Sequence, residues 1–260
     1  MLYKITKKIK RSFGRFLSKI YHQLDRAVAE YYAKSKRPLV REYILSKFFP
    51  DPNRSFQRHN SEYEEEKSFE REKSNYEDYK KRNCFNGPES KYEDFIKSHP
   101  EVRELAIDIG SGCGWLSVEL SRFFKKVIGI EPSKKAVVIA EQLKPVQCKN
   151  IEYVNTYAEE GLDKLSIPCK ALFVTGCVLG HLPDETVSKI CQAVEKKALP
   201  GSLLVFAEAW GKEFHAPMWN ARTKEWWQAN LPSWKIDFLK YNRPEDRPNE
   251  HRGFQAVKIK

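Results

Sequence analysis

The sequence predicts an α/β protein: a doubly wound, seven-stranded, mostly parallel sheet with an antiparallel last strand, preceded by an N-terminal helical extension. After Pro100, short apolar strands alternate with helical stretches, which is typical of a parallel sheet covered by helices on both faces. A glycine-rich turn joins the first strand to the helix that follows it. The last two strands are linked by a loop too short for a crossover helix, so we expect them to pair antiparallel.

The first 90 residues are predicted to form the helical extension. Residues 2–24 carry apolar side chains at three- and four-residue spacing, with Lys and Arg on the other face, which predicts a basic amphipathic helix. This segment contains seven basic residues and no acid, so it holds most of the formal net charge of +11. Residues 61–82 are densely charged, with oppositely charged pairs four residues apart. They predict a second helix, which either leans on the domain by a narrow aromatic edge or closes over it as a lid.

Residues 91–260 are predicted to form the domain that contains the sheet. Each expected strand is a short run of apolar, often β-branched residues, while Ser133 and Pro200 mark the start and the end of helices. The expected strands are residues 105–109, 127–131, 151–154, 171–174, 203–207, 234–241 and 254–260. The expected helices are residues 92–97, 115–124, 133–143, 159–165 and 184–198.

Composition excludes several classes of protein. No apolar run reaches the roughly 18 residues that a membrane-spanning helix needs. Six scattered cysteines include no pair at C-x-x-C spacing, so neither a zinc site nor a redox pair is expected, and we predict no metal. Free thiols favour a reducing compartment. We therefore expect a cytoplasmic protein, with peripheral attachment to a membrane as an option for residues 2–24.

The turn Asp108-Ile109-Gly110-Ser111-Gly112-Cys113-Gly114 lies directly between a strand and a helix, the context in which a glycine pattern indicates a ligand site. Glycines allow the backbone to turn sharply and to approach a ligand closely. A dinucleotide fingerprint needs Gly or Ala three residues after Gly112, where this chain has Trp115. No Gly-Lys-Ser/Thr motif for a nucleoside triphosphate is present either. The turn therefore indicates a nucleoside-like ligand without a pyrophosphate.

Two acids at the ends of neighbouring strands fit such a ligand. Asp108 can accept hydrogen bonds from the amides of the turn or, through them or water, from a ligand ammonium. Glu131, the last residue of the second expected strand, is placed to accept hydrogen bonds from both hydroxyls of a ribose. S-adenosylmethionine combines a cationic amino-acid tail, a ribose and an adenine, so it is the expected cofactor.

With these motifs, the chain from about Tyr92 to Lys260 resembles the class I S-adenosylmethionine-dependent methyltransferase family, which has a Rossmann-like fold. The resemblance implies that Glu131 binds the ribose and that the methionine part rests on Asp108, Gly110, Ser111 and Gly112. It implies that the adenine is edged by Tyr157, Ala158 and Glu159, although the family often has an acid at the first of these positions. It also implies that the loop beneath the transferred methyl group is formed by Thr175, Gly176 and Cys177.

Three side chains near the C-terminal ends of the strands are candidate general bases, namely His181, His215 and Glu208. A base assists a hydroxyl acceptor but is not required, because positioning alone can supply roughly 7–11 kcal/mol. A plain structural role stays open for His181, because its stretch often begins a helix in the resembling family.

The insertion between the fifth and sixth strands is rich in aromatic and basic residues, which could wall a sugar, a planar substrate or a nucleobase. We expect Trp210 and Trp219 in that wall. Trp226 and Trp227 are instead expected to pack their helix against the sheet.

The favoured function is O-methylation of a glycan, a lipid-linked acceptor or another small hydroxyl-bearing molecule. RNA methylation and non-catalytic binding of S-adenosylmethionine are the alternatives. The Asn- or Asp-Pro-Pro-Tyr motif expected of enzymes that methylate a base nitrogen is absent after the fourth strand, which counts against RNA. Residues 2–24 could bind an anionic membrane surface, bind nucleic acid, cover their own domain or act as a targeting segment.

Overall fold

The computed structural model describes residues 69–70, 72–74, 89–176, 178–211, 214–216, 219–239 and 250–260. The predicted basic helix 2–24 lies outside the described residues. So does most of the predicted helix 61–82, although residues 69–70 and 72–74 within it are helical.

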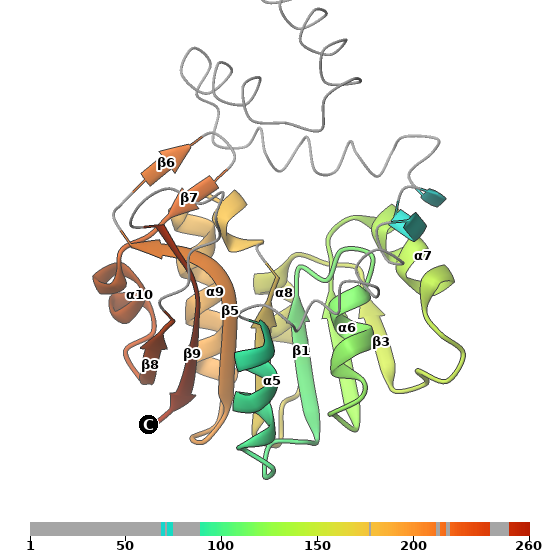
Figure 1. Ribbon diagram of the computed structural model, residues 1–260, viewed down its shortest axis with the longest axis horizontal. Helices are drawn as coiled ribbons and strands as arrows, with labels where there is room; N and C mark the ends of the chain where they lie inside the picture. The colour runs from blue at the N-terminus through green and yellow to red at the C-terminus, as the bar shows by residue number, and fades with distance from the viewer. Residues whose placement is uncertain are drawn as a thin grey trace, which may run out of the picture. The chain divides into compact units, whose positions relative to one another are not determined.

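A seven-stranded sheet forms the centre of the described part of the chain, in the order β3-β2-β1-β4-β5-β9-β8 (Figure 1). Neighbouring strands from β3 to β5 run parallel, whereas β9 is antiparallel to both β5 and β8. The predicted fold class is therefore confirmed. The strands are β1 (Leu105–Ile109), β2 (Lys126–Ile130), β3 (Ile151–Val154), β4 (Ala171–Thr175), β5 (Leu203–Gly211), β8 (Trp234–Phe238) and β9 (Glu250–Lys258).

Helices cover both faces of this sheet (Figure 1). One apolar cluster joins the sheet to α5 and α6, and another joins its opposite face to α8, α9 and α10. Because both faces are covered, the central strands are buried and mainly apolar: all five residues of β1 are buried, and four of them are apolar. The helices are α5 (Glu89–Lys97), α6 (Trp115–Leu120), α7 (Lys134–Leu143), α8 (Ala158–Lys164), α9 (Asp184–Lys197), α10 (Lys224–Asn230) and the 3₁₀ turn η2 (Leu179–His181).

Most element bounds agree with the sequence prediction within a few residues. The expected cap of α7 is present, because the Ser133 hydroxyl accepts a hydrogen bond from the Ala136 amide at 3.3 Å. The largest difference lies in β5 and β9. Strand β5 continues to Gly211, beyond the expected end at residue 207, and β9 begins at Glu250, before the expected start at residue 254. The added residues pair with one another across a β-bulge that shifts the register between Phe206 and Ala209.

The insertion between β5 and β8 contains a hairpin, β6 (Phe214–Ala216) and β7 (Trp219–Ala221), followed by α10. Trp227 of α10 is fully buried, with its ring centroid 4.9 Å from that of Phe254, which confirms that it packs the helix on the sheet. Trp210 is also buried, and its indole N–H donates to the Gly253 carbonyl at 2.8 Å. The expectation that Trp210 walls an acceptor is therefore wrong. The side chain of Trp219 lies outside the described residues.

Gly253 lies opposite the β-bulge with a φ of +83°, a conformation that residues with a Cβ rarely adopt. A Cβ there would also collide with the Tyr92 hydroxyl of α5. Gly253→Ala should therefore lower the free energy of unfolding by at least about 1–2 kcal/mol, measured by urea denaturation. Gly176→Ala is the matched control, because its Cβ would meet Leu116 at an ordinary 3.5 Å. Equal losses of stability in the two variants would contradict this account.

Candidate cofactor and active site

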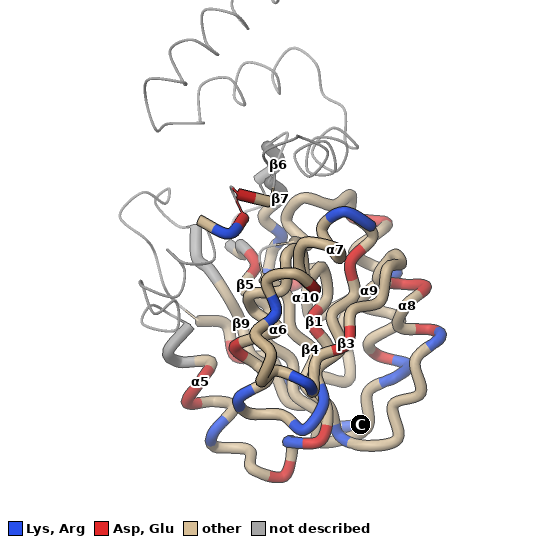
Figure 2. The backbone as a smooth tube through the Cα atoms, turned by 90° about the vertical axis from the view of Figure 1, so that its right-hand side faces the viewer, with Lys and Arg blue, Asp and Glu red and all other residues tan. Residues whose placement is uncertain are grey.

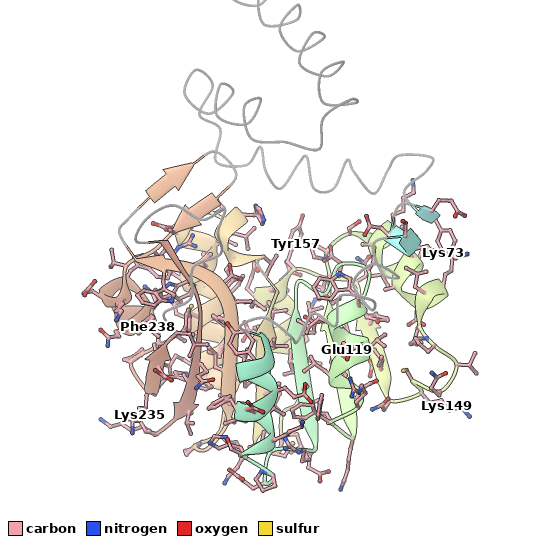
Figure 3. The ribbon with its side chains drawn as sticks, in the orientation of Figure 1. Lys73, Glu119, Lys149, Tyr157, Lys235 and Phe238 are labelled. Carbon is pink, nitrogen blue, oxygen red and sulfur yellow. The ribbon has the colours of Figure 1, made fainter. Side chains whose placement is uncertain are left out.

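A cavity of about 430 Å³ opens beyond the C-terminal ends of β1, β2 and β4. This is the usual ligand crevice of an open α/β sheet, at the point where the strand order reverses between β1 and β4. The turn after β1 and the residue after β2 contribute Asp108, Gly110, Ser111, Gly112 and Glu131 to its lining. The segments after β3 and β4 contribute Tyr157, Ala158, Glu159, Gly176 and His181. The structure thus gathers most of the predicted site residues around one space, with Tyr157 at its half-exposed rim (Figure 3).

The backbone of the glycine-rich turn can reverse sharply because its glycines adopt left-handed conformations. Gly110, Gly112 and Gly114 have φ values of 72°, 52° and 82°. A Cβ on Gly110 would lie 2.6 Å from the Val178 side chain in the loop after β4. The missing side chain therefore lets the loops after β1 and β4 approach each other and form adjoining walls of the cavity.

Glu131 lies directly after β2 and is only 3% exposed. One of its carboxylate oxygens accepts a hydrogen bond from the Gly112 amide at 3.0 Å, and the other accepts one from the Ser133 amide at 2.8 Å. These bonds tie the glycine-rich turn to the start of α7. Because a carboxylate can accept about four hydrogen bonds, Glu131 can hold both amides and also receive the two hydroxyls of a ribose.

Asp108 is a buried carboxylate of the cavity lining that the described residues satisfy only in part. Its side chain is 1% exposed, and its Oδ2 accepts a hydrogen bond from the Ser117 hydroxyl at 2.6 Å. Among the described residues, its Oδ1 and the nearby Ser111 hydroxyl are buried without a hydrogen-bond partner. Burial raises the pKa of Asp108 to about 7, and the charge of Glu131 adds to the rise, while the bond from Ser117 opposes it. An unmatched acceptor in a cavity fits a ligand that brings a cation or a hydrogen-bond donor.

Four predicted site residues do not line the cavity in the described structure. Thr175 and Glu208 are buried beneath the loop after β4, and the Thr175 hydroxyl donates to a Glu208 oxygen at 2.8 Å. Cys177 lies outside the described residues, and only the backbone of His215, in β6, is described. Of the three candidate bases, His181 is the one that lines the cavity within the described part of the chain.

The structure adds residues that the sequence reasoning missed. The cavity is also lined by Leu179, Leu182, Pro183, Thr186, Ile190 and Glu72. The first three belong to the stretch around His181, whose only sequence signal was its place after a strand. Glu72 belongs to the charged segment 61–82, and Phe69 of that segment packs against a small apolar cluster that includes Cys113 of the glycine-rich turn. These contacts agree with an aromatic edge resting on the domain.

Residues 106–201 match a family described as a methyltransferase domain. They include all but the first residue of β1, the glycine-rich turn, Glu131 and His181, and they end after α9. Over these residues the chain is similar to that family of methyltransferase domains, in agreement with the resemblance that the sequence motifs carry. S-adenosylmethionine is the expected cofactor, and its ammonium and ribose suit the buried carboxylates of Asp108 and Glu131 that line the cavity.

A relative from Dictyostelium discoideum, named as a methyltransferase, is 47% identical over 66 residues. The match spans 25% of this chain and only 23% of that relative. A solved structure described as an S-adenosylmethionine-dependent methyltransferase from Listeria monocytogenes is 15% identical, with a TM-score of 0.48, over 64% of this chain and 97% of that chain. A Streptococcus mutans protein described as a methyltransferase in complex with SAH is 16% identical, with a TM-score of 0.49, over 66% and 98% of the two chains.

The raised pKa of Asp108 predicts a pH-dependent affinity for S-adenosylmethionine. The ionised carboxylate should favour the cationic ligand, and with a pKa of about 7 only a few per cent of the free protein is ionised at pH 5.5. Affinity should therefore rise roughly tenfold between pH 5.5 and pH 7, with release of almost one proton at the acid end. Calorimetric titration in buffers of different ionisation enthalpy measures both the affinity for S-adenosylmethionine and the number of protons released. Asp108→Asn should bind more weakly with little pH dependence, and an equal slope in both proteins would contradict the assignment.

Proposed function

We propose that this chain is an O-methyltransferase for a small hydroxyl-bearing acceptor, such as a glycan or a lipid-linked sugar, and that His181 accepts the proton of the hydroxyl. The observation that carries the proposal is that His181 lines the same cavity as the glycine-rich turn and Glu131. A histidine is suited to proton transfer near neutral pH. When bound, S-adenosylmethionine supplies an activated methyl group, and its sulfonium becomes a neutral thioether as the methyl group leaves.

The protein's own residues would align the reactants and exclude water. Asp108 would hold the ammonium of the cofactor and Glu131 its ribose, and two such anchors would restrict its orientation toward an acceptor. Apolar residues line the cavity, including Trp115 and Leu116 at the start of α6 and Leu182 in the loop after β4. Their presence reduces the water near the sulfonium, which favours transfer to the acceptor over hydrolysis. His181 would take the hydroxyl proton as the new oxygen–carbon bond forms.

RNA methylation remains the alternative function. Figure 2 shows Lys and Arg positions interspersed with Asp and Glu positions along the described backbone. A panel of radiolabelled methyl-transfer assays can separate the classes, with soluble oligosaccharides, glycolipids in detergent and total RNA as acceptors. We expect the radiolabelled methyl group in an oligosaccharide or a glycolipid. Label in RNA alone would overturn the proposal.

Replacing the proposed base gives a more specific test. His181→Gln should lower kcat by roughly 10²- to 10⁴-fold on a hydroxyl acceptor from the panel, with little change in the affinity for S-adenosylmethionine. His99→Gln is the matched control, because His99 follows α5 and its ring bonds the Phe95 carbonyl, away from the cavity lining. If both variants retained the wild-type kcat, His181 would not be the base.

We also propose that residues 2–24 attach the chain to anionic membrane surfaces, where acceptors on lipids are presented. Support comes from the sequence pattern, since each basic residue near such a surface contributes about 1 kcal/mol. None of the described helices is long and apolar enough to cross a membrane.

Co-sedimentation with vesicles tests the attachment. The full chain should bind phosphatidylserine-containing vesicles more strongly than pure phosphatidylcholine vesicles, and added salt should weaken the binding. The double variant Lys8→Glu and Arg11→Glu should lose this preference. Lys149→Glu with Lys235→Glu, which changes the same charge at exposed positions of the domain (Figure 3), should keep most of it. Equal losses in the two double variants would assign binding to net charge rather than to residues 2–24.

A further inference from the structure

A buried polar network lies beneath the loop that follows β4. Glu208 is 1% exposed and Arg222 is 2% exposed, and neither lines the cofactor cavity. Both side chains instead bond to the short segment Val178–Pro183, which contains η2 and contributes the side chains of Leu179, His181 and Leu182 to the cavity lining.

Glu208 holds this segment from the β5 side. One carboxylate oxygen accepts hydrogen bonds from the Thr175 hydroxyl at 2.8 Å and the Leu179 amide at 3.0 Å, and the other accepts one from the Gly180 amide at 2.8 Å. Glu208 belongs to the bulged part of β5, between Phe206 and Ala209. Bulges commonly re-aim a side chain beside an active site. All three bonds are therefore directed at the end of β4 and the turn that follows it.

Arg222, which directly follows β7, holds the same segment. Its guanidinium donates to the Leu179 carbonyl at 3.0 Å, the Leu182 carbonyl at 2.8 Å and the Asp184 carboxylate at 2.8 Å. It also lies over the Trp226 ring, 4.9 Å from the centroid. The peptide groups of Leu179 are thus held on both sides, because its N–H donates to Glu208 and its carbonyl accepts from Arg222.

We propose that Glu208 and Arg222 are positioning residues that fix the segment Val178–Pro183 as a wall of the S-adenosylmethionine cavity. They are 14 positions apart and flank the β6–β7 hairpin in the sequence. Without Arg222, the two carbonyls lose their donor and the segment has to be ordered again when the cofactor binds. That ordering reduces the affinity for the cofactor. The proposal rests on the cofactor site and not on the acceptor or on the role of His181.

Calorimetric titration with S-adenosylmethionine tests the proposal well below the melting temperature of each variant. Arg222→Met should weaken binding by about tenfold or more. Arg222→Lys should restore part of the affinity, because one ammonium keeps the charge but cannot reproduce the fork that reaches three acceptors. Thr175→Val, which removes one bond to Glu208 at nearly constant volume, should weaken binding to a smaller extent.

Lys258→Met provides the matched structural control. Lys258 is also a buried cation that donates to main-chain carbonyls, those of Glu195 and Ala198, but it does so at the C-terminal end of α9, away from the cavity lining. Its loss should lower the urea midpoint without changing the affinity for S-adenosylmethionine. Wild-type affinity in folded Arg222→Met, or an equal loss in Lys258→Met, would overturn the proposal.

The outcome is separable from the proposed acceptor chemistry. His181→Gln should lose turnover but keep cofactor affinity, whereas Arg222→Met should lose affinity in a titration that contains no acceptor. If no hydroxyl acceptor is ever methylated, the O-methyltransferase proposal fails while the binding titration still decides the role of Arg222. If Arg222→Met does not fold, Arg222→Lys and Thr175→Val decide it, and wild-type affinity in both would contradict it.

Discussion

The cavity depends on carboxylates that are buried at the C-terminal end of the sheet. A buried charge is tolerated only where donors surround it, and the donors available at this end are the amides and hydroxyls of the loops. Glu131, after β2, accepts a hydrogen bond from the Gly112 amide in the turn after β1. Glu208, in β5, binds amides of the turn after β4. The loop after β1 is therefore held by the acid that follows β2, and the loop after β4 is held by an acid in β5.

This arrangement explains why the cavity opens between β1 and β4. The chain leaves these neighbouring strands in opposite directions across the sheet, since β2 and β3 lie on one side and β5, β9 and β8 on the other. Gly110 lets the two loops approach, because a Cβ there would clash with Val178. Burial raises the pKa of Glu208, whereas its bonds and the charge of Arg222 lower it, so the network of loop donors also favours its ionised form.

The features that sequence could predict are those with local causes. The glycine-rich turn, the Ser133 cap and the alternation of strands and helices depend on neighbouring residues, and the structure confirms them. The role of Glu208 depends on a bulge whose partner strand begins about 40 residues later, and Arg222 meets Leu179 across 43 positions. From residue type alone, Glu208 is expected to be a general base, and the basic residues of the insertion that contains Arg222 are expected to wall a substrate. Only the tertiary arrangement shows that both are occupied by main-chain groups.

Asp108 differs from the other two acids because loop groups do not satisfy it fully. An acid whose pKa is raised from 3.8 to about 7 on folding reduces stability as the pH rises through that interval, since the unfolded chain releases the proton more readily. The reduction is complete above pH 7 and absent well below 3.8. A bound cation lowers the pKa of Asp108 again and recovers this free energy. Ionised Asp108 thus destabilises the free protein, and a bound cation offsets this cost. Cofactor binding should therefore stabilise the fold more at neutral pH than at pH 5.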